Sequence, residues 1–199
     1  LNFLKEEYNM ANKDAAFGTR PVGKVGQNAD NGGLSEYIIT ASATAITQND
    51  LVKLKADGSV EVAGAGGFVV GSLNGVFFTD ATTGKPTFAN NLAGSNAATD
   101  IKGFIYDDPY QRFEIQTNNT GASQLTDINN NADIAYSVGV TPNFISKSEL
   151  DDSTLAAGAA TLRILGLSKD PDNSDVGSAN VNWIVAINEH QHGKNVDGI

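Results

Sequence analysis

The chain has 199 residues, which is enough for one sizeable domain with its own core or for one domain plus a long arm. No stretch approaches the roughly 20 continuous apolar residues that a membrane-spanning helix needs. The formal charge of -10 repels phosphate backbones and anionic lipid surfaces. We therefore expect neither nucleic acid nor a membrane as a partner.

The composition favours short strands joined by tight turns. Glycine, with 21 residues, stands above its usual share of about 7 %, and Asn, Asp, Ser and Thr are frequent while proline is scarce. Cysteine is absent, so the fold has no disulfide and no thiolate zinc site. Stability must come from core burial and assembly.

Residues 1–9 differ from the rest, because Lys5-Glu6-Glu7 lies just before Met10. These codons can form a purine-rich ribosome-binding sequence ahead of a start codon. Residues 1–9 are therefore either a translated leader, which would indicate a bacterial or phage gene, or a genuine N-terminal extension.

The segment 10–33 predicts an extended N-terminal arm, so that residues 1–33 precede a β-rich domain at 34–199. It has few large apolar residues, frequent Gly and Asn, and neither a helical nor a strand period. We expect it either to dock on a neighbouring surface or to be a loose terminus. For docking, Phe17 would be an apolar anchor and Arg20 a hydrogen-bond donor. The candidate contact residues are Phe17, Arg20, Pro21, Val22, Lys24 and Val25.

The remaining sequence predicts a series of short strands. They alternate or are rich in β-branched and aromatic residues, and Asp57-Gly58 and the run 107–110 are strong turn signals. A short helix is expected at 125–131, capped by Ser123 or Thr126. This spacing predicts a mainly β fold, an antiparallel sandwich or barrel-like domain with at most one or two short helices. The expected strands are 36–40, 51–55, 60–62, 68–78, 87–89, 101–106, 112–116, 134–138, 162–167 and 181–187.

Few side chains suggest chemistry. His190 and His192 could share one metal ion, but two ligands do not make a site, and a solvated tail is the preferred interpretation. The run 170–175 has the carboxylate density of a calcium loop without the glycine and glutamate spacing, which favours a turn with Asx hydrogen bonds. Asp107 and Asp108 are adjacent on a turn rather than opposed like paired catalytic carboxylates.

Motifs of nucleophilic catalysis and of phosphate binding are missing from the sequence. We therefore expect a protein that is not an enzyme, with no catalytic residue, no cofactor and no bound metal.

Several blocks of the sequence together suggest a family: MANKDAAFG at 10–18, NGGLSEY at 31–37, FIYDDPYQRFEIQ at 104–116, DINNNAD at 127–133 and KDPDNS at 169–174. These blocks resemble small head-associated structural proteins of marine tailed bacteriophages. The resemblance covers nearly all of residues 10–190. It implies a virion protein that binds the outer surface of an icosahedral capsid, as a decoration or cement protein, often as a trimer of β-domains with extended arms.

The resemblance makes the major capsid protein the expected partner and a homo-oligomer, with three subunits, the expected assembly. A phage tail or receptor-binding protein is the nearest alternative within virions. A non-viral carbohydrate-binding module is the alternative from another class, and it would require aromatic residues exposed in a row. Its only candidates are Tyr106, Tyr110 and Phe113.

Overall fold

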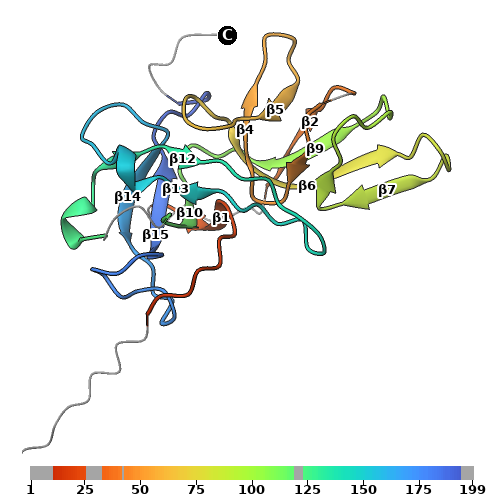
Figure 1. The fold of residues 1–199 in the computed structure, drawn as a ribbon. Helices are drawn as coiled ribbons and strands as arrows, with labels where there is room; N and C mark the ends of the chain where they lie inside the picture. The colour runs from red at the N-terminus through yellow and green to blue at the C-terminus, as the bar shows by residue number, and fades with distance from the viewer. Residues whose placement is uncertain (1–10, 26–32, 42, 119–122, 194–199) are drawn as a thin grey trace, which may run out of the picture.

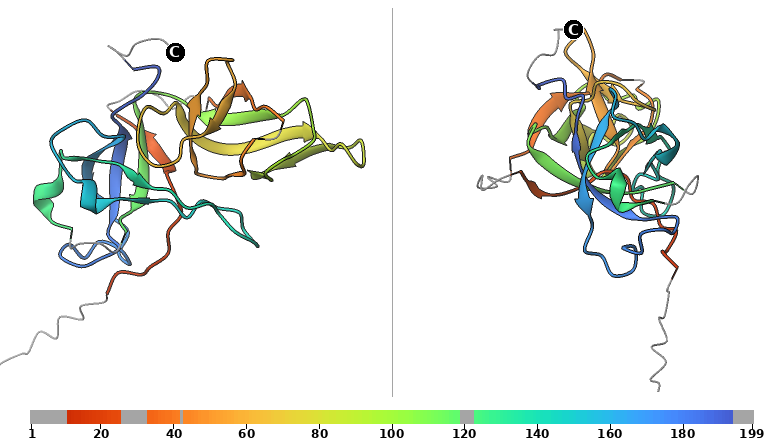
Figure 2. Two further views of the ribbon diagram at one scale, coloured as in Figure 1. Left: turned by 45° about the horizontal axis from the view of Figure 1, so that its top comes forward. Right: turned by 90° about the vertical axis from the view of Figure 1, so that its left-hand side faces the viewer.

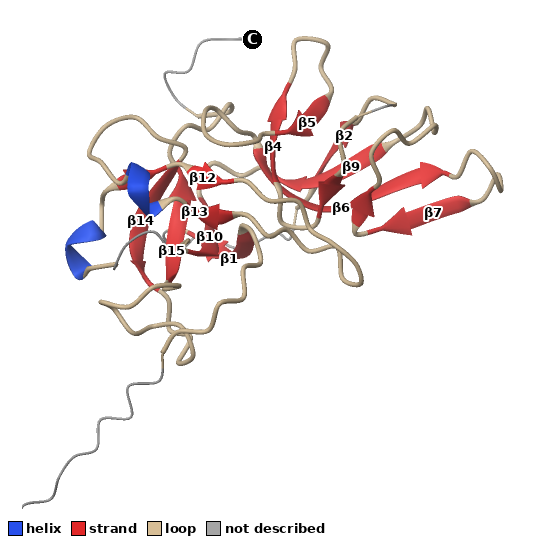
Figure 3. Ribbon diagram, viewed as in Figure 1, coloured by secondary structure: helices blue, strands red, loops and turns tan. Residues whose placement is uncertain are grey.

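The computed structural model describes residues 11–25, 33–41, 43–118 and 123–193. The chain folds into two lobes of antiparallel β-strands that lie side by side (Figure 1 and Figure 2). The helices of the described residues are two single turns of 3-10 helix, η1 (Leu125–Asp127) and η2 (Asp152–Thr154), both at the side of one lobe (Figure 3). The predicted mainly β fold is confirmed.

The first lobe is built on a five-stranded sheet in which every pairing is antiparallel. Its strand order is β1 (Arg20–Lys24), β10 (Gln111–Gln116), β15 (Asn182–Ile187), β14 (Leu162–Leu167) and β11 (Asn131–Ala132). A two-stranded sheet of β12 (Ile134–Ala135) and β13 (Glu149–Leu150) packs against it through Ile134 and Leu150.

Alternation along the strands separates the two faces of this sheet. On β10 and β15, the side chains of Phe113, Ile115, Trp183 and Val185 are fully buried in one hydrophobic cluster. The intervening residues, Glu114 among them, face the other side. Leu51 and Val69 of the second lobe also belong to the cluster, so the first core extends to the junction between the lobes.

The second lobe is a small barrel. A six-stranded sheet has the order β2 (Ser35–Ile38), β9 (Lys102–Tyr106), β6 (Gly71–Thr79), β4 (Leu51–Leu54) and β5 (Val60–Val62), with β7 (Pro86–Ala89) paired to β6. A parallel bridge between Ile39 and Val60 brings its two ends together. A short pair, β3 (Ile46–Thr47) with β8 (Asn91–Leu92), completes the lobe. Twelve buried hydrophobic residues, including Val76, Phe78 and Ile105, form its separate core.

Two β-hairpins form in the barrel, and the first of them confirms the predicted turn at Asp57-Gly58. The β4–β5 hairpin turns at Asp57-Gly58, where Gly58 has φ +79° and the Asp57 carboxylate accepts hydrogen bonds from Ser59. The β6–β7 hairpin turns at Asp80, whose carboxylate accepts from the N–H groups of Thr82 and Thr83. In both turns a side-chain oxygen satisfies backbone donors that the strands leave free.

Two predicted elements are shorter than expected. The helix expected at 125–131 is only η1, because Ile128 is already extended and Asn129 has φ +75°. The strand expected at 134–138 ends at Ala135.

The sequence predicted no strand within residues 10–33. This prediction is wrong for Arg20–Lys24, which form β1. The preceding residues also contact the lobes. Asn12 donates hydrogen bonds to the carbonyls of Asp175 and Ala179, and Thr19 bonds to Asn49 and Ser72 of the barrel. Between them, Gly18 has φ +70° and lies so close to Asn49 and Ser146 that a Cβ would clash. Residues 11–25 therefore follow the body of the protein instead of extending away from it.

Candidate interaction surface

The predicted contact residues lie on and beside an edge strand. Among the strands that the structure describes, β1 pairs only with β10, and its register shifts between Pro21 and Gly23. Arg20 and Val22 are exposed, whereas Phe17, Pro21, Lys24 and Val25 are partly buried. A proline and a bulge both interrupt the row of donors and acceptors on a sheet edge. The edge is therefore poorly suited to adding another strand, and contacts at β1 must use side chains.

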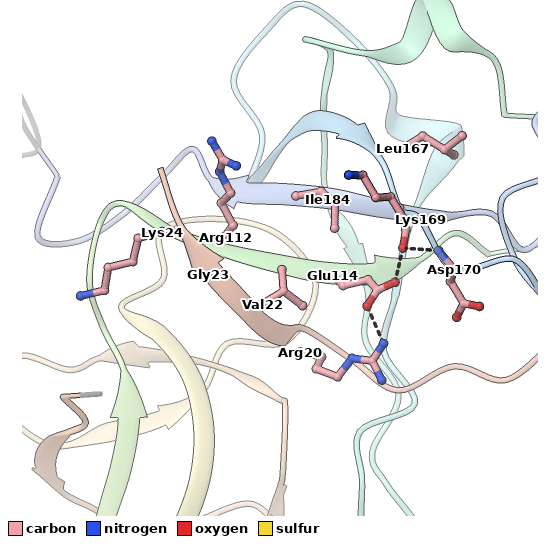
Figure 4. A pocket seen from close by; sticks show the side chains of 11 residues that line it. Arg20, Val22, Gly23, Lys24, Arg112, Glu114, Leu167, Lys169, Asp170 and Ile184 are labelled. Carbon is pink, nitrogen blue, oxygen red and sulfur yellow. Dashed lines mark hydrogen bonds and ion pairs between the residues drawn. The ribbon is translucent and has the colours of Figure 1, made fainter. Parts of the chain in front are cut away.

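Arg20 takes part in a network that ties β1 to the centre of the sheet. Its guanidinium donates to Glu114 Oε2 at 2.5 Å, and Ser168 Oγ donates to Glu114 Oε1 at the same distance (Figure 4). Glu114 is only 5 % exposed, so these two donors compensate for the removal of its carboxylate from water. The Arg20 guanidinium also lies 4.6 Å from the centre of the Phe17 ring.

Phe17 is held from its backbone as well as from its ring. The Asn49 side chain donates to the Phe17 carbonyl at 3.0 Å, and Lys147 Nζ donates to the neighbouring carbonyl of Ala16. The ring lines a hollow beside Val140 and Pro142. Phe17 is thus an internal contact between segments as much as a surface residue, which the sequence did not indicate.

The far end of β1 is fixed by the turn at residues 107–110. Lys24 Nζ lies 2.7 Å from Asp108 Oδ2, and the Val25 N–H donates to the Tyr110 carbonyl. The bond from Lys24, together with one from the Tyr110 N–H, lowers the pKa of Asp108. The turn predicted here is confirmed, because Gln111 N–H donates to the Asp108 carbonyl.

An open groove of about 680 Å³ runs along the outer face of the first sheet beside β1 (Figure 4). Val22, Leu167 and Ile184 supply its apolar part. Four cations and two carboxylates line it, a formal balance of +2 on a chain of -10. The charged residues are Arg20, Lys24, Arg112 and Lys169 with Glu114 and Asp170. We call this surface the β1 groove.

The sequence missed most of the β1 groove, since only Arg20, Val22 and Lys24 among its lining residues were candidates. Arg112, Glu114 and Lys169 were not candidates, because they are far from residues 10–33 along the chain. Alternation in β10 places Arg112 and Glu114 on the face opposite Phe113, and this signal was available. The alternation in β10 does not show which strand lies beside it. Arg20 lies opposite Glu114 only because β1 pairs with β10 in this register.

The interpretation of His190 as part of a solvated tail is wrong. Its side chain is 3 % exposed, because Val69 N–H donates to Glu189 and Gln191 bonds to Val69 and Leu54 of the barrel. Burial, with a smaller contribution from His192, lowers the pKa of His190 to about 4. His192 itself is exposed. Within the described residues, no group of three or more His, Cys, Asp or Glu side chains is placed to hold a metal ion.

The acidic run 170–175 forms the predicted turn. The Asp170 carboxylate accepts from the Asp172 N–H at 3.1 Å, an Asx hydrogen bond, and Asp175 contacts Asn12 and Ser178. The three aromatic residues that the sequence offered for a carbohydrate-binding row, Tyr106, Tyr110 and Phe113, do not form one, since Phe113 is fully buried while Tyr110 is 52 % exposed.

Comparison of the chain with protein families, curated proteins and solved structures finds no match. In the described part of the chain, no helix is long and apolar enough to cross a membrane.

Proposed function

We propose that this protein is a non-enzymatic structural protein of a tailed-phage virion that binds the outer surface of the icosahedral head and stabilises it. The observation that carries the proposal is the β1 groove, a cationic and partly apolar surface on a strongly acidic chain. It includes Arg20, Val22 and Lys24, three of the residues for which the sequence predicted contact with a neighbouring surface. The partner is the major capsid protein.

The groove has the composition of a protein-binding surface. Val22 is 48 % exposed at its margin, which offers apolar area to a partner, while Arg112 and Lys169 offer donors to carboxylates. An acidic segment of the capsid protein is the complementary ligand. The rest of the surface repels such a segment, so the groove also sets the orientation of docking.

The body of the protein suits a clamp. Its strands are joined by tight turns, and both residues 11–25 and residues 189–191 connect the two lobes through hydrogen bonds. A rigid body that spans neighbouring capsid subunits holds them at a fixed separation, and the small stabilisation from each copy adds up over the many copies on one head.

The experiment mixes purified protein with undecorated heads and counts the copies bound to each particle. Val22→Asp combined with Lys169→Glu should abolish binding while leaving the melting temperature unchanged, because both side chains are peripheral to the core. Leu125→Asp is the matched control, since Leu125 is 61 % exposed in η1 and does not line the groove. Full occupancy by the double variant would refute the role of the groove. If the protein instead binds complete phage particles only at the tail, the function is a tail function and not head decoration.

A further inference from the structure

A second surface lies on the outside of the barrel, away from its core. The register places Ile38 opposite Lys102, Lys102 opposite Phe77, and Phe77 opposite Phe88. Residues opposite one another on adjacent strands share a face of the sheet. The flanking residues Val76 and Phe78 belong to the core, so this row points outward. We call the surface the outer barrel face; it comprises Glu36, Ile38, Phe77, Phe88, Lys102 and Phe104.

The outer barrel face exposes two large apolar side chains. Ile38 is 65 % exposed and Phe88 is 64 % exposed. The rings of Phe88 and Phe104 lie 5.9 Å apart between centres. Gly75 makes this possible, because a Cβ at that position would lie 3.2 Å from the Phe88 ring. Two large apolar side chains and a paired aromatic ring on one sheet face are typical of an interface.

The remaining exposed apolar side chains are not gathered in this way. Of the large ones in the described residues, Val22, Phe68, Tyr110 and Leu125 come from four separate segments of the chain, and Val138 and Val140 from one loop. On the outer barrel face, by contrast, the exposed apolar side chains lie on paired strands beside a pair of neighbouring aromatic rings.

The charges of the outer barrel face are balanced. Glu36 Oε1 lies 2.9 Å from Lys102 Nζ, and the two side chains are about half exposed. The face is thus formally neutral on a chain of -10. Two acidic molecules repel one another over most orientations, and this neutral apolar face is where they can approach.

We propose that a second copy of this chain packs on the outer barrel face, related to the first by a two-fold axis. Under two-fold symmetry every contact occurs twice: if one residue of the first copy contacts a second residue of the other copy, that second residue of the first copy contacts the first residue of the other. Glu36 of each copy then faces Lys102 of the other, and the four charges alternate around a square. Between the copies, Phe88 and Ile38 are buried. The arrangement goes beyond the proposed function and does not require it, because the β1 groove belongs to the other lobe.

The first test measures association by sedimentation equilibrium. The wild-type chain should be a dimer. Phe88→Ser should raise the dissociation constant of the dimer by roughly 100-fold, because each dimer buries two of these rings. Leu125→Ser is the control of similar exposure and should leave association unchanged. A wild-type monomer, or a dimer that Phe88→Ser does not weaken, overturns the proposal. A trimer, as the sequence resemblance implies, overturns the two-fold arrangement.

The second test uses charge reversal and separates self-association from folding. Glu36→Lys alone and Lys102→Glu alone should each be monomeric, since like charges then meet across the axis. An equimolar mixture of the two variants should form a heterodimer with opposite charges at both contacts. The control is Lys53→Glu with Glu61→Lys, a cross-strand pair of similar exposure on β4 and β5. Failure of the mixture to associate refutes the contact, whatever the outcome of head binding.

Discussion

Replacing His190 with Gln should remove a pH dependence of stability that burial creates. In the folded protein the pKa of His190 is lowered from 6.5 to about 4, first by desolvation and then by His192, against a partial opposing effect of Asp107 and Asp108. Since the folded pKa lies below the unfolded one, the unfolded chain binds the proton first as the pH falls. Protonation of His190 therefore has no effect on the free energy of unfolding above pH 6.5. Below that pH the free energy of unfolding decreases as the pH falls towards 4.

The size of the effect follows from the same two values. A pKa lowered from 6.5 to about 4 corresponds to roughly 3 kcal/mol of stability that is present at neutral pH and lost across this window. Because the side chain is 3 % exposed, solvent screening reduces this figure little. Carboxylates with a lowered pKa, such as Asp108, act mainly below the window. Those with a raised pKa, such as Glu149, act in the same way in both proteins and cancel in the difference.

The assay is urea unfolding of wild type and His190→Gln at a series of pH values between neutral and 4. The wild-type free energy of unfolding should fall more steeply, and the difference between the proteins should shrink by roughly 3 kcal/mol as the pH decreases. His192→Gln serves as the control and should reduce the wild-type slope only slightly, because His192 contributes less than burial. Parallel curves for wild type and His190→Gln would refute the reasoning and show that His190 is reached by solvent.

Three further changes test the packing. Trp183→Ala should cost roughly 3–5 kcal/mol in urea unfolding, because Trp183 is fully buried in the first core; a cost below 1 kcal/mol would show that the site collapses freely. Glu114→Ala should cost about 1–3 kcal/mol, since it leaves Ser168 and Arg20 without their acceptor, whereas Glu61→Ala on the surface should cost under about 1 kcal/mol. Deleting residues 1–25 removes β1 and the contacts of Asn12 and Thr19, so the melting temperature should fall sharply, while deleting residues 1–10 removes none of these contacts. Equal melting temperatures for the two truncations would show that β1 is a dispensable edge.

The sequence alone was sufficient to place most strands and turns of the β-rich part. Alternation in residues 111–116 and 162–167 and the Asp57-Gly58 turn are local signals, because side-chain direction and turn conformation depend on a few neighbouring residues. The acidic charge and the missing cysteines follow from composition. The candidate residues Arg20 and Val22 were also found from the sequence, though for a different reason, as parts of a free arm.

Tertiary structure decided everything that depends on distant segments meeting. Residues 20–24 have no strand period and become β1 only because β10 supplies their hydrogen-bond partners, ninety residues away in the register Arg20 with Glu114. His190 is buried because Val69 and Leu54 hold the segment after β15 against the barrel. The β1 groove and the outer barrel face likewise arise from strand register. Local sequence fixes which way a side chain points along its own strand, whereas the identity of its neighbours is set by non-local pairing, whose energy appears only when the whole sheet is formed.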